Sequence, residues 1–404
     1  MTQQFLDHLA RSFGATHSRR TLAAIALSVL AAGSPPATDA KKKKRKKKKA
    51  GKGGSGTCTP QCTNKVCGNN GCGGSCGTCG AGTTCSGGQC VAADSYVFAG
   101  KWGRVGPGNS EFAYAGGIAV EGNAFVYVAD TGNHRIQKFT TDGTFQSAWG
   151  VQGGNPGEFE QPSGIAVQAA TGVFVSDWAT NRIQYSTTSG QLISYWGEYG
   201  TEPGKLNTVR ALAIGSDGNL LVADRHNHRV QQFAAVNGTL VRVWGSYGAG
   251  EGQLNQPQGI AAGQDGVFYV ADTGNHRIQK YHIGSGYLSA WGTAGSGEGE
   301  FLRPEGLAVD TQGNVYVADR DSHRIQIFDA DGNFLDTFGS SGSADGQFNQ
   351  PLAVAVDTDG VVYVSDGANF RIQKFAPAPG RGPAGRSAQT HHHRRSRRRS
   401  RGRR

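Results

Sequence analysis

Eleven residues occur twice almost unchanged in this chain of 404 residues, as ADTGNHRIQKF at 129–139 and as ADTGNHRIQKY at 271–281. The same theme appears six times, each time as an aspartate followed five residues later by an arginine. Its aspartates stand at positions 130, 177, 224, 272, 319 and 366, so successive copies lie 47 or 48 residues apart. A period of this length is typical of propeller blades or of helical solenoids. The residue pattern inside each copy must decide between these two architectures.

The copies contain short apolar runs and show no helical periodicity. Each has a run such as GIAV (164–167), a second such as VYVAD (126–130), the run RIQKF or a variant of it, and a run that ends in Trp-Gly or Phe-Gly. Alternating β-branched and aromatic residues between Asp-Gly and Gly-Asn turns are typical of antiparallel strands. The 63 glycines fit tight turns that require a positive φ. Each copy is therefore predicted to form a four-stranded β-sheet.

The array begins and ends at different phases of the repeat. It opens with YVFAGKWG at 96–103, which matches the fourth run, and it closes with RIQKF at 371–375, which matches the third. A ring can close if the first strand of the array completes the last blade, and closure removes the exposed sheet edges of a linear array. We therefore predict an all-β fold, a six-bladed β-propeller closed by an N-terminal strand, within a domain of residues 91–380.

The repeated unit resembles the NHL repeat, through its pattern P-x-G-I-A-V followed by G-x-V-Y-V-A-D-x-x-N-H-R-I-Q-K-F. All six copies carry the resemblance, although the His position is held by Asn181 in the second copy and by Phe370 in the sixth. Members of this family include bacterial extracytoplasmic sensor propellers, tripartite-motif proteins that bind RNA or protein, and a peptidyl-amidating lyase. The resemblance implies a six-bladed propeller but no single function, because one fold hosts many functions.

The N-terminal residues 1–40 are predicted to be an export segment. Two arginines at 19 and 20 precede about eleven apolar residues and then small residues and prolines, as in a twin-arginine signal. The apolar run is short for a bilayer span. We expect an exported protein, located outside the cell or in the cell envelope; the alternative is a fortuitous apolar segment.

A polybasic linker (41–57) leads into a Cys-rich module (58–90), where all eight cysteines of the chain lie. So short a segment cannot build an adequate apolar core, and an exported protein can form disulfides. The alternative is a zinc cluster, since two of the cysteines are spaced C-x2-C. We predict disulfides without a defined pairing. The cysteines are Cys58, Cys62, Cys67, Cys72, Cys76, Cys79, Cys85 and Cys90.

Charge divides the chain into basic ends and an acidic propeller. Residues 41–52 and 381–404 carry ten basic side chains each, whereas residues 91–380 carry 17 basic and 28 acidic side chains, a net charge of −11. An acidic ring disfavours nucleic acid, which needs a basic surface. The tail (381–404) and the linker, predicted to be disordered, could bind an anionic membrane or a cell-wall polymer, or could serve only as solvated segments.

The recurring Asp and Arg residues are predicted to pair and to stabilise the turn between the second and third strands, because every blade has them. Their sameness argues against a unique active site. The pairs are Asp130/Arg135, Asp177/Arg182, Asp224/Arg229, Asp272/Arg277, Asp319/Arg324 and Asp366/Arg371.

A ligand-binding rim is predicted where the blades differ. The residue before GIAV is different in every copy, and the turn between the second and third strands should open on the same face of the central channel. Trp178, the one tryptophan outside the Trp-Gly pattern, lies in such a turn. An aromatic side chain beside charged ones suits a peptide or a sugar. The predicted rim residues are Ser163, Trp178, Arg210, Arg225, His226, Gln258, Glu305, Arg320 and Asp321.

These features favour a monomeric, non-catalytic binding or scaffolding protein that recognises a protein, peptide or glycan. We predict no catalytic residues, no metal ligands and no cofactor. The alternative is a metal-dependent lyase or lactonase with zinc or calcium in the channel, as the resemblance to lyase and lactonase propellers allows. His226 and His282 are the only propeller histidines outside the repeat position, and they lie in different turns.

Overall fold

The computed structural model describes residues 83–86, 89–92, 95–169 and 171–378. The predicted export segment, polybasic linker and C-terminal tail lie outside the described residues, as does most of the Cys-rich module. Near the end of that module, β1 (Thr83–Ser86) and β2 (Gln89–Ala92) pair as a two-stranded antiparallel sheet. The predicted disulfides concern side chains that are not among those described.

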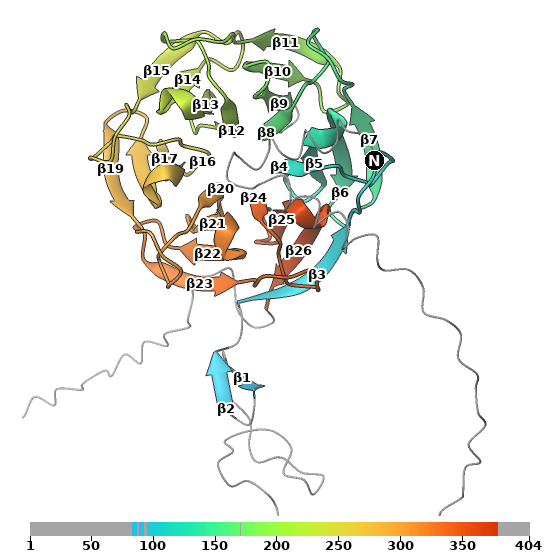
Figure 1. Cartoon of the computed structure of the whole chain (residues 1–404), viewed down its shortest axis with the longest axis vertical. Coiled ribbons are helices and arrows are strands. Elements are labelled where there is room, and N and C mark those ends of the chain that lie inside the picture. Colours follow the sequence, from blue (N-terminus) through green and yellow to red (C-terminus); the bar gives the residue numbers. More distant parts are fainter. Residues whose placement is uncertain (1–82, 87–88, 93–94, 170, 379–404) are drawn as a thin grey trace, which may run out of the picture. The chain divides into compact units, whose positions relative to one another are not determined.

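Residues 95–378 form six four-stranded antiparallel sheets arranged as a ring of blades (Figure 1). The first strand of each blade lies nearest the centre of the ring and the fourth lies at the outer edge. The first strands are β4 (Ala115–Glu121), β8 (Pro162–Gln168), β12 (Val209–Ile214), β16 (Ile260–Ala262), β20 (Pro304–Val309) and β24 (Pro351–Val356). The second strands are β5 (Phe125–Asp130), β9 (Gly172–Asp177), β13 (Leu220–Asp224), β17 (Val267–Asp272), β21 (Val315–Asp319) and β25 (Val362–Asp366).

The two outer layers complete the blades. The third strands are β6 (Arg135–Thr140), β10 (Arg182–Ser186), β14 (Arg229–Phe233), β18 (Arg277–His282), β22 (Arg324–Phe328) and β26 (Arg371–Pro377). The fourth strands are β7 (Phe145–Trp149), β11 (Leu192–Trp196), β15 (Leu240–Trp244), β19 (Gly286–Trp291), β23 (Phe334–Phe338) and β3 (Tyr96–Trp102). The prediction of an all-β, six-bladed propeller is confirmed.

The hydrophobic core lies in the seams between consecutive blades. One cluster joins Tyr127 and Ile136 of the first blade to Ile165 and Val175 of the second. Because a blade is covered on both faces, its second strand is buried throughout, as in β13, whereas the fourth strand alternates between half-buried and exposed residues, as in β7. The alternation expected for every strand is therefore strong only at the outer edge of the ring.

Strand β3 pairs antiparallel with β26 and is the fourth strand of the sixth sheet. Trp102 faces Ile372 in the register of this pair, and the hydroxyl of Tyr96 lies 2.7 Å from that of Tyr316 in the fifth blade. Ser95 extends the contact, since its N–H donates to Asp336 Oδ2 at 3.1 Å. The sixth sheet thus joins residues from the beginning and the end of the described ring.

A residue with left-handed backbone ends the turn between the second and third strands in all six blades. Five of these turns are short 3₁₀ helices: η1 (Thr131–Asn133), η2 (Arg225–Asn227), η3 (Thr273–Asn275), η4 (Arg320–Ser322) and η5 (Gly367–Asn369). The following residue, a histidine in four blades, has φ between 54° and 57°. The histidine ring then contacts the next blade; for example, His228 Nδ1 accepts from the Gln256 N–H at 3.1 Å. The repeated His therefore ties neighbouring blades together.

Candidate ligand-binding site at the centre of the turn face

We call the turn face the face of the ring formed by the turns between second and third strands and by the loops that join consecutive blades. These two sets of segments contact each other directly. In the third blade, Asn227 Nδ2 of the turn donates to Gly200 O of the joining loop at 2.9 Å, and the ring of His228 packs against Tyr247 with centroids 4.7 Å apart. Side chains from both sets therefore share this face.

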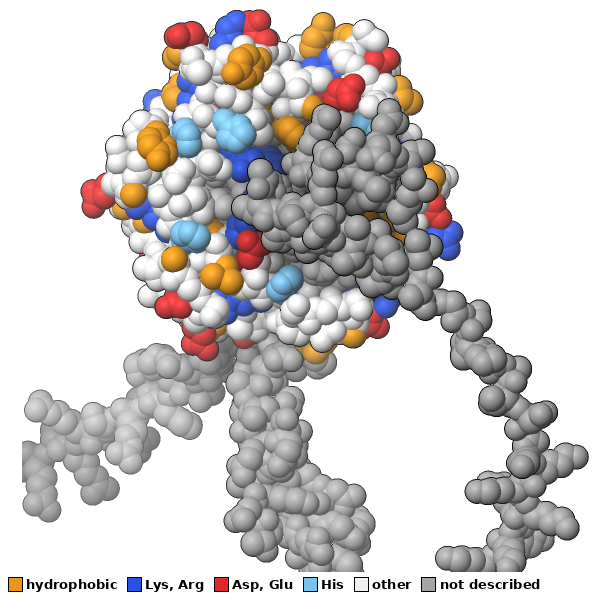
Figure 2. Space-filling model, viewed as in Figure 1, with side chains coloured by type: hydrophobic (Ala, Val, Ile, Leu, Met, Phe, Trp, Pro, Cys, Tyr) orange, Lys and Arg blue, Asp and Glu red, His pale blue; other side chains and the backbone are white. Residues whose placement is uncertain are grey.

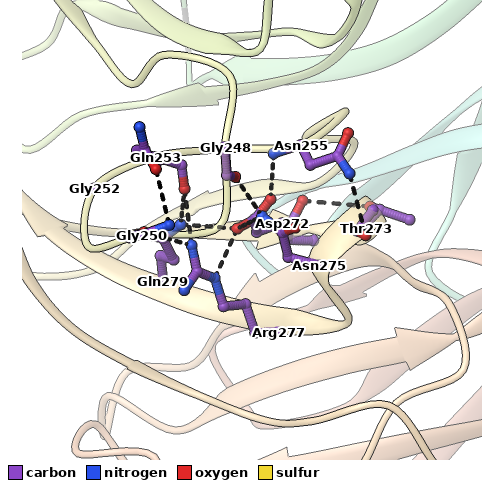
Figure 3. A network of polar contacts seen from close by, with 12 residues as sticks. Gly248, Gly250, Gly252, Gln253, Asn255, Asp272, Thr273, Asn275, Arg277 and Gln279 are labelled. Carbon is purple, nitrogen blue, oxygen red and sulfur yellow. Dashed lines mark hydrogen bonds and ion pairs between the residues drawn. The ribbon is translucent and has the colours of Figure 1, made fainter.

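The repeated polar residues form the scaffold beneath the turn face, as the fourth blade shows (Figure 3). Asp272 Oδ2 accepts hydrogen bonds from Asn275, Arg277 and Gln279, each at 2.8 Å, and Oδ1 accepts from the Asn255 N–H at 2.6 Å. Arg277 also donates to the carbonyls of Gly250 and Gln253 in the preceding loop. Both carboxylate oxygens are thus occupied within the protein, which gives this aspartate a structural role.

The strength of the Asp–Arg contact follows the residue three positions after the aspartate. Where that residue is asparagine, the arginine Nε lies 2.7–2.8 Å from the carboxylate. In the fifth blade Ser322 replaces the asparagine and the distance is 3.4 Å. In the second blade Thr180 replaces it, and Arg182 Nε has no hydrogen-bond partner among the residues that the structure describes. Five of the six predicted pairs are therefore ion pairs with a nitrogen–oxygen distance of 3.4 Å or less. The second blade differs from the prediction, because Arg182 donates to the loop carbonyls of Asn155 and Glu158 instead.

Four arginines and one glutamate meet at the centre of the turn face; we call Arg210, Arg225, Arg303, Glu305 and Arg320 the central cluster. Glu305 is buried on β20 and accepts from Arg303 Nε at 2.6 Å and from Arg320 Nη1 at 3.2 Å. Arg320 Nη2 donates to Gln350 Oε1 at 2.9 Å. On the face seen in Figure 2, blue side chains lie near the middle and pale-blue histidines lie around them.

The third blade supplies the other two arginines. Arg225 Nη2 donates to Gln256 Oε1 at 2.8 Å, and the Arg210 guanidinium lies over the indole of Trp178, 5.5 Å from its centroid. The Nε atoms of Arg210, Arg225 and Arg320 are buried and have no hydrogen-bond partner among the described residues. Such donors are costly to bury unsatisfied. The central cluster therefore contains three donors whose hydrogen-bonding capacity is not used by the described residues.

The charges of the central cluster interact across the ring. Burial, together with Arg210 and Arg303, lowers the pKa of Arg225 to about 10. Burial alone would raise the pKa of Glu305, but Arg320, Arg303 and Arg210 hold it below its usual value. Tyr114 of the first blade also feels the cluster, since burial and then Glu305 raise its pKa. Because the first, third and fifth blades contribute, the cluster lies near the axis of the ring.

The remaining predicted rim residues divide into two groups. Gln258 is buried with its Nε2 3.4 Å from Glu305 Oε1. His226 follows Arg225 in η2, with its Nδ1 2.9 Å from Thr208 Oγ1, so both residues adjoin the central cluster. Asp321 is half exposed, 3.8 Å from Arg320 Nε. Ser163 differs: it is buried, and its hydroxyl contacts Ser176 Oγ and the Val209 carbonyl. At Ser163 the residue before GIAV therefore packs in the seam between blades and does not line the rim, contrary to the prediction.

Sequence reasoning missed Arg303, Gln256, Gln350 and Tyr114. They occupy one position of the repeat, two residues before the residue that precedes the GIAV run. That position also varies between blades, as Tyr114, Gln161, Thr208, Gln256, Arg303 and Gln350. Comparing it in the same way would have found the fourth arginine of the central cluster.

Metal ligands do not converge in the described part of the chain. No group of three or more His, Cys, Asp or Glu side chains that could hold a metal ion is present there. His226 and His282 lie apart: His226 is in η2, whereas His282 ends β18, and its Nδ1 accepts from the N–H groups of Gly284 and Ser285 in the following hairpin. Within residues 83–378, as far as they are described, no helix has the length and apolar character needed to cross a membrane.

Five segments match the family model named NHL repeat: residues 112–139, 206–233, 254–281, 301–328 and 348–375. These segments belong to every blade except the second, where Thr180 and Asn181 replace the usual Asn and His. No curated protein matches the chain.

Similar solved structures share the fold at low sequence identity. One is a protein of unknown function from Bacteroides thetaiotaomicron, with 20% identity and a TM-score of 0.55, over 72% of this chain and 79% of that chain. Another is a gluconolactonase from Xanthomonas campestris, with 17% identity and a TM-score of 0.50, over 65% of this chain and 86% of that one. The chain is therefore a six-bladed β-propeller that carries NHL repeats.

Proposed function

We propose that this protein is a non-catalytic binding or scaffolding propeller that recognises a protein, peptide or glycan through the centre of its turn face. The observation that carries the proposal is the set of three buried Nε atoms in the central cluster that have no hydrogen-bond partner in the described part of the chain, one of them on Arg210 beside Trp178. An unsatisfied buried donor costs about 1–3 kcal/mol. A ligand that supplied acceptors here would remove that cost, and arginine and tryptophan are the side chains most enriched where proteins bind partners tightly.

The experiment uses an array of immobilised glycans and peptides probed with the labelled full-length chain. A double variant, Trp178→Ala with Arg210→Ala, removes the aromatic contact, and Arg242→Ala on the outer strand β15 is the matched control because it removes an exposed charge elsewhere. We expect some probes to bind the wild type and the control but not the double variant. Equal binding by all three proteins, or no binding by the wild type, would show that the turn face is not a recognition surface.

The alternative function is a metal-dependent lactonase or lyase. The gluconolactonase from Xanthomonas campestris has the same fold, and its likeness to this chain concerns the fold alone. Mass spectrometry of residues 91–380, which exclude the cysteines, separates the two functions. One zinc or calcium ion per chain that resists dialysis would favour the enzyme; a metal-free propeller that still binds an array probe would favour the binding protein.

The proposal also covers where the binding takes place, and this part rests on the sequence of the chain's ends. We place the protein outside the cytoplasm, through the export segment at 1–40, with a disulfide-stapled module between the polybasic linker and the propeller. The basic linker and tail would hold the propeller near an anionic membrane or cell-wall polymer.

A further inference from the structure

The chemistry of the central cluster indicates what kind of ligand it binds. The propeller carries a net charge of −11, yet its centre gathers four arginines around one carboxylate, Glu305. An excess of half-buried positive charge inside an acidic domain is not explained by solubility. It is the local arrangement expected for an anion.

Glu305 shows which oxyanion the cluster accommodates. Its carboxylate already lies between Arg303 and Arg320, 2.6 Å and 3.2 Å from their nitrogens. Arg210 and Arg225 have no carboxylate partner among the described residues, and the Nε of each is free. The planar guanidinium fork matches a carboxylate in two parallel hydrogen bonds. A second carboxylate, supplied by the ligand, is the kind of partner that these two arginines lack.

The surroundings of the cluster favour a sugar over a peptide as the carrier of that carboxylate. Trp178 covers one side of Arg210, with its ring centroid 5.5 Å from the guanidinium carbon. The indole offers a flat apolar surface, and the amides of Gln256 and Gln258 place neutral hydrogen-bonding groups beside the cluster. Flat faces beside neutral polar groups suit the apolar face and the hydroxyls of a pyranose ring.

We infer that the turn face binds a uronic acid, as the free sugar acid or as a unit of an acidic polysaccharide, with its carboxylate held by Arg210 and Arg225 and its ring against Trp178. This inference rests on the proposed function and specifies its ligand. The free sugar and the polysaccharide share the recognised group, so the experiment must distinguish them.

Isothermal titration of the full-length chain with galacturonate, with trigalacturonate and with the neutral methyl ester of trigalacturonate tests the inference. We expect trigalacturonate to bind at least tenfold more tightly than its ester. Comparable affinity for galacturonate would identify the single sugar acid as the ligand, and binding of the trimer alone would identify the polymer. Equal affinity for acid and ester, or tighter binding of a hexaglutamate peptide or a uridine oligonucleotide, would overturn the inference.

Protein variants separate the site from the basic ends of the chain, which attract any polyanion. Arg225→Gln should weaken trigalacturonate binding at least tenfold. The control Arg242→Gln, which removes the same single positive charge, should leave binding unchanged. Equal losses would place the binding outside the central cluster. If Arg225→Gln fails to fold, Arg210→Lys keeps the charge but loses the planar fork and should still weaken binding. Should acid and ester bind equally and both depend on Trp178, the proposed function would stand and the uronic acid would be wrong.

Discussion

The guanidinium of Arg210 lies over the indole of Trp178, with its central carbon 5.5 Å from the ring centroid. The two residues come from neighbouring blades, Arg210 from β12 of the third and Trp178 from the turn that follows β9 of the second. A cation–π contact of this kind is worth about 0.5–2 kcal/mol. It joins the aromatic surface and the charged cluster into one site, and the predictions about binding follow from that union.

Replacing Glu305 by glutamine should strengthen anion binding and weaken the fold. Its carboxylate pairs with Arg303 and Arg320 and offsets part of the positive charge. Its loss leaves more positive charge for the ligand, while these two arginines lose their counter-ion. We expect trigalacturonate affinity to rise about tenfold and the melting temperature to fall, measured by titration and by circular dichroism. Weaker binding by the folded Glu305→Gln variant would mean that Glu305 contacts the ligand favourably.

Binding should also strengthen as the pH falls from 7.5 to 5.5. Burial, Arg225 and Arg210 lower the pKa of His226 below its usual 6.5, so this ring is neutral in the free protein at neutral pH. A bound carboxylate favours the protonated ring, and protonation then adds a positive charge to the site. Glu305 does not titrate in this range because its pKa lies below 4.5. We expect roughly threefold tighter binding at pH 5.5, and a flat profile for His226→Asn.

The lowered pKa of His226 has another consequence: acidification, which should strengthen binding, should reduce the stability of the free protein. A histidine whose folded pKa is lowered contributes its full stability above the unfolded pKa of about 6.5 and loses it as the pH falls. Without ligand, His226→Asn should therefore reduce the loss of stability on acidification. Identical acid unfolding curves for the variant and the wild type would show that His226 does not titrate in this way.

Ser322→Asn should stabilise the protein. Blades with asparagine at this position bring the arginine to 2.7–2.8 Å from the carboxylate. In the fifth blade the distance is 3.4 Å, and the hydroxyl of Ser322 has no hydrogen-bond partner in the described part of the chain. The asparagine would donate to Asp319 and to the loop carbonyl, as Asn275 does to Asp272 and Gly248. We expect about 1 kcal/mol of added unfolding free energy in urea. Ser322→Ala is the control, and equal stability of the two variants would contradict the explanation.

Gly332→Ala should destabilise the ring far more than Gly204→Ala. Both glycines have left-handed backbone, with φ of 87° and 89°, so both substitutions carry the same backbone strain. A Cβ at Gly332 would lie 2.6 Å from Trp291 of the preceding blade, whereas one at Gly204 would meet no atom within 4 Å. We expect the two variants to differ by about 1–3 kcal/mol in unfolding free energy. Equal losses of unfolding free energy in the two variants would mean that the close approach of Gly332 to Trp291 does not affect stability.

The fold could be predicted because the repeat period, the strand-like runs and the phases of the array ends all depend on local sequence. The site could be predicted only in part. Variation between blades pointed to Trp178, Arg210 and Glu305, yet the same signal selected Ser163. Whether a variable side chain turns toward the ring centre or into a seam depends on packing between blades, which one copy of the repeat does not encode. The unpaired Nε of Arg182 likewise required the structure, because its cause is Thr180 and not a change in Asp or Arg.

Indole fluorescence tests the central claim most directly. Five of the six tryptophans belong to the outer-strand pattern, and Trp178 alone lies in the turn beside the central cluster. Titration of the full-length chain with trigalacturonate should give a saturable change in tryptophan emission that disappears in Trp178→Phe. If ligand binds with no change in emission, or if the change persists in Trp178→Phe, the ligand lies elsewhere on the protein and the turn face is not its site.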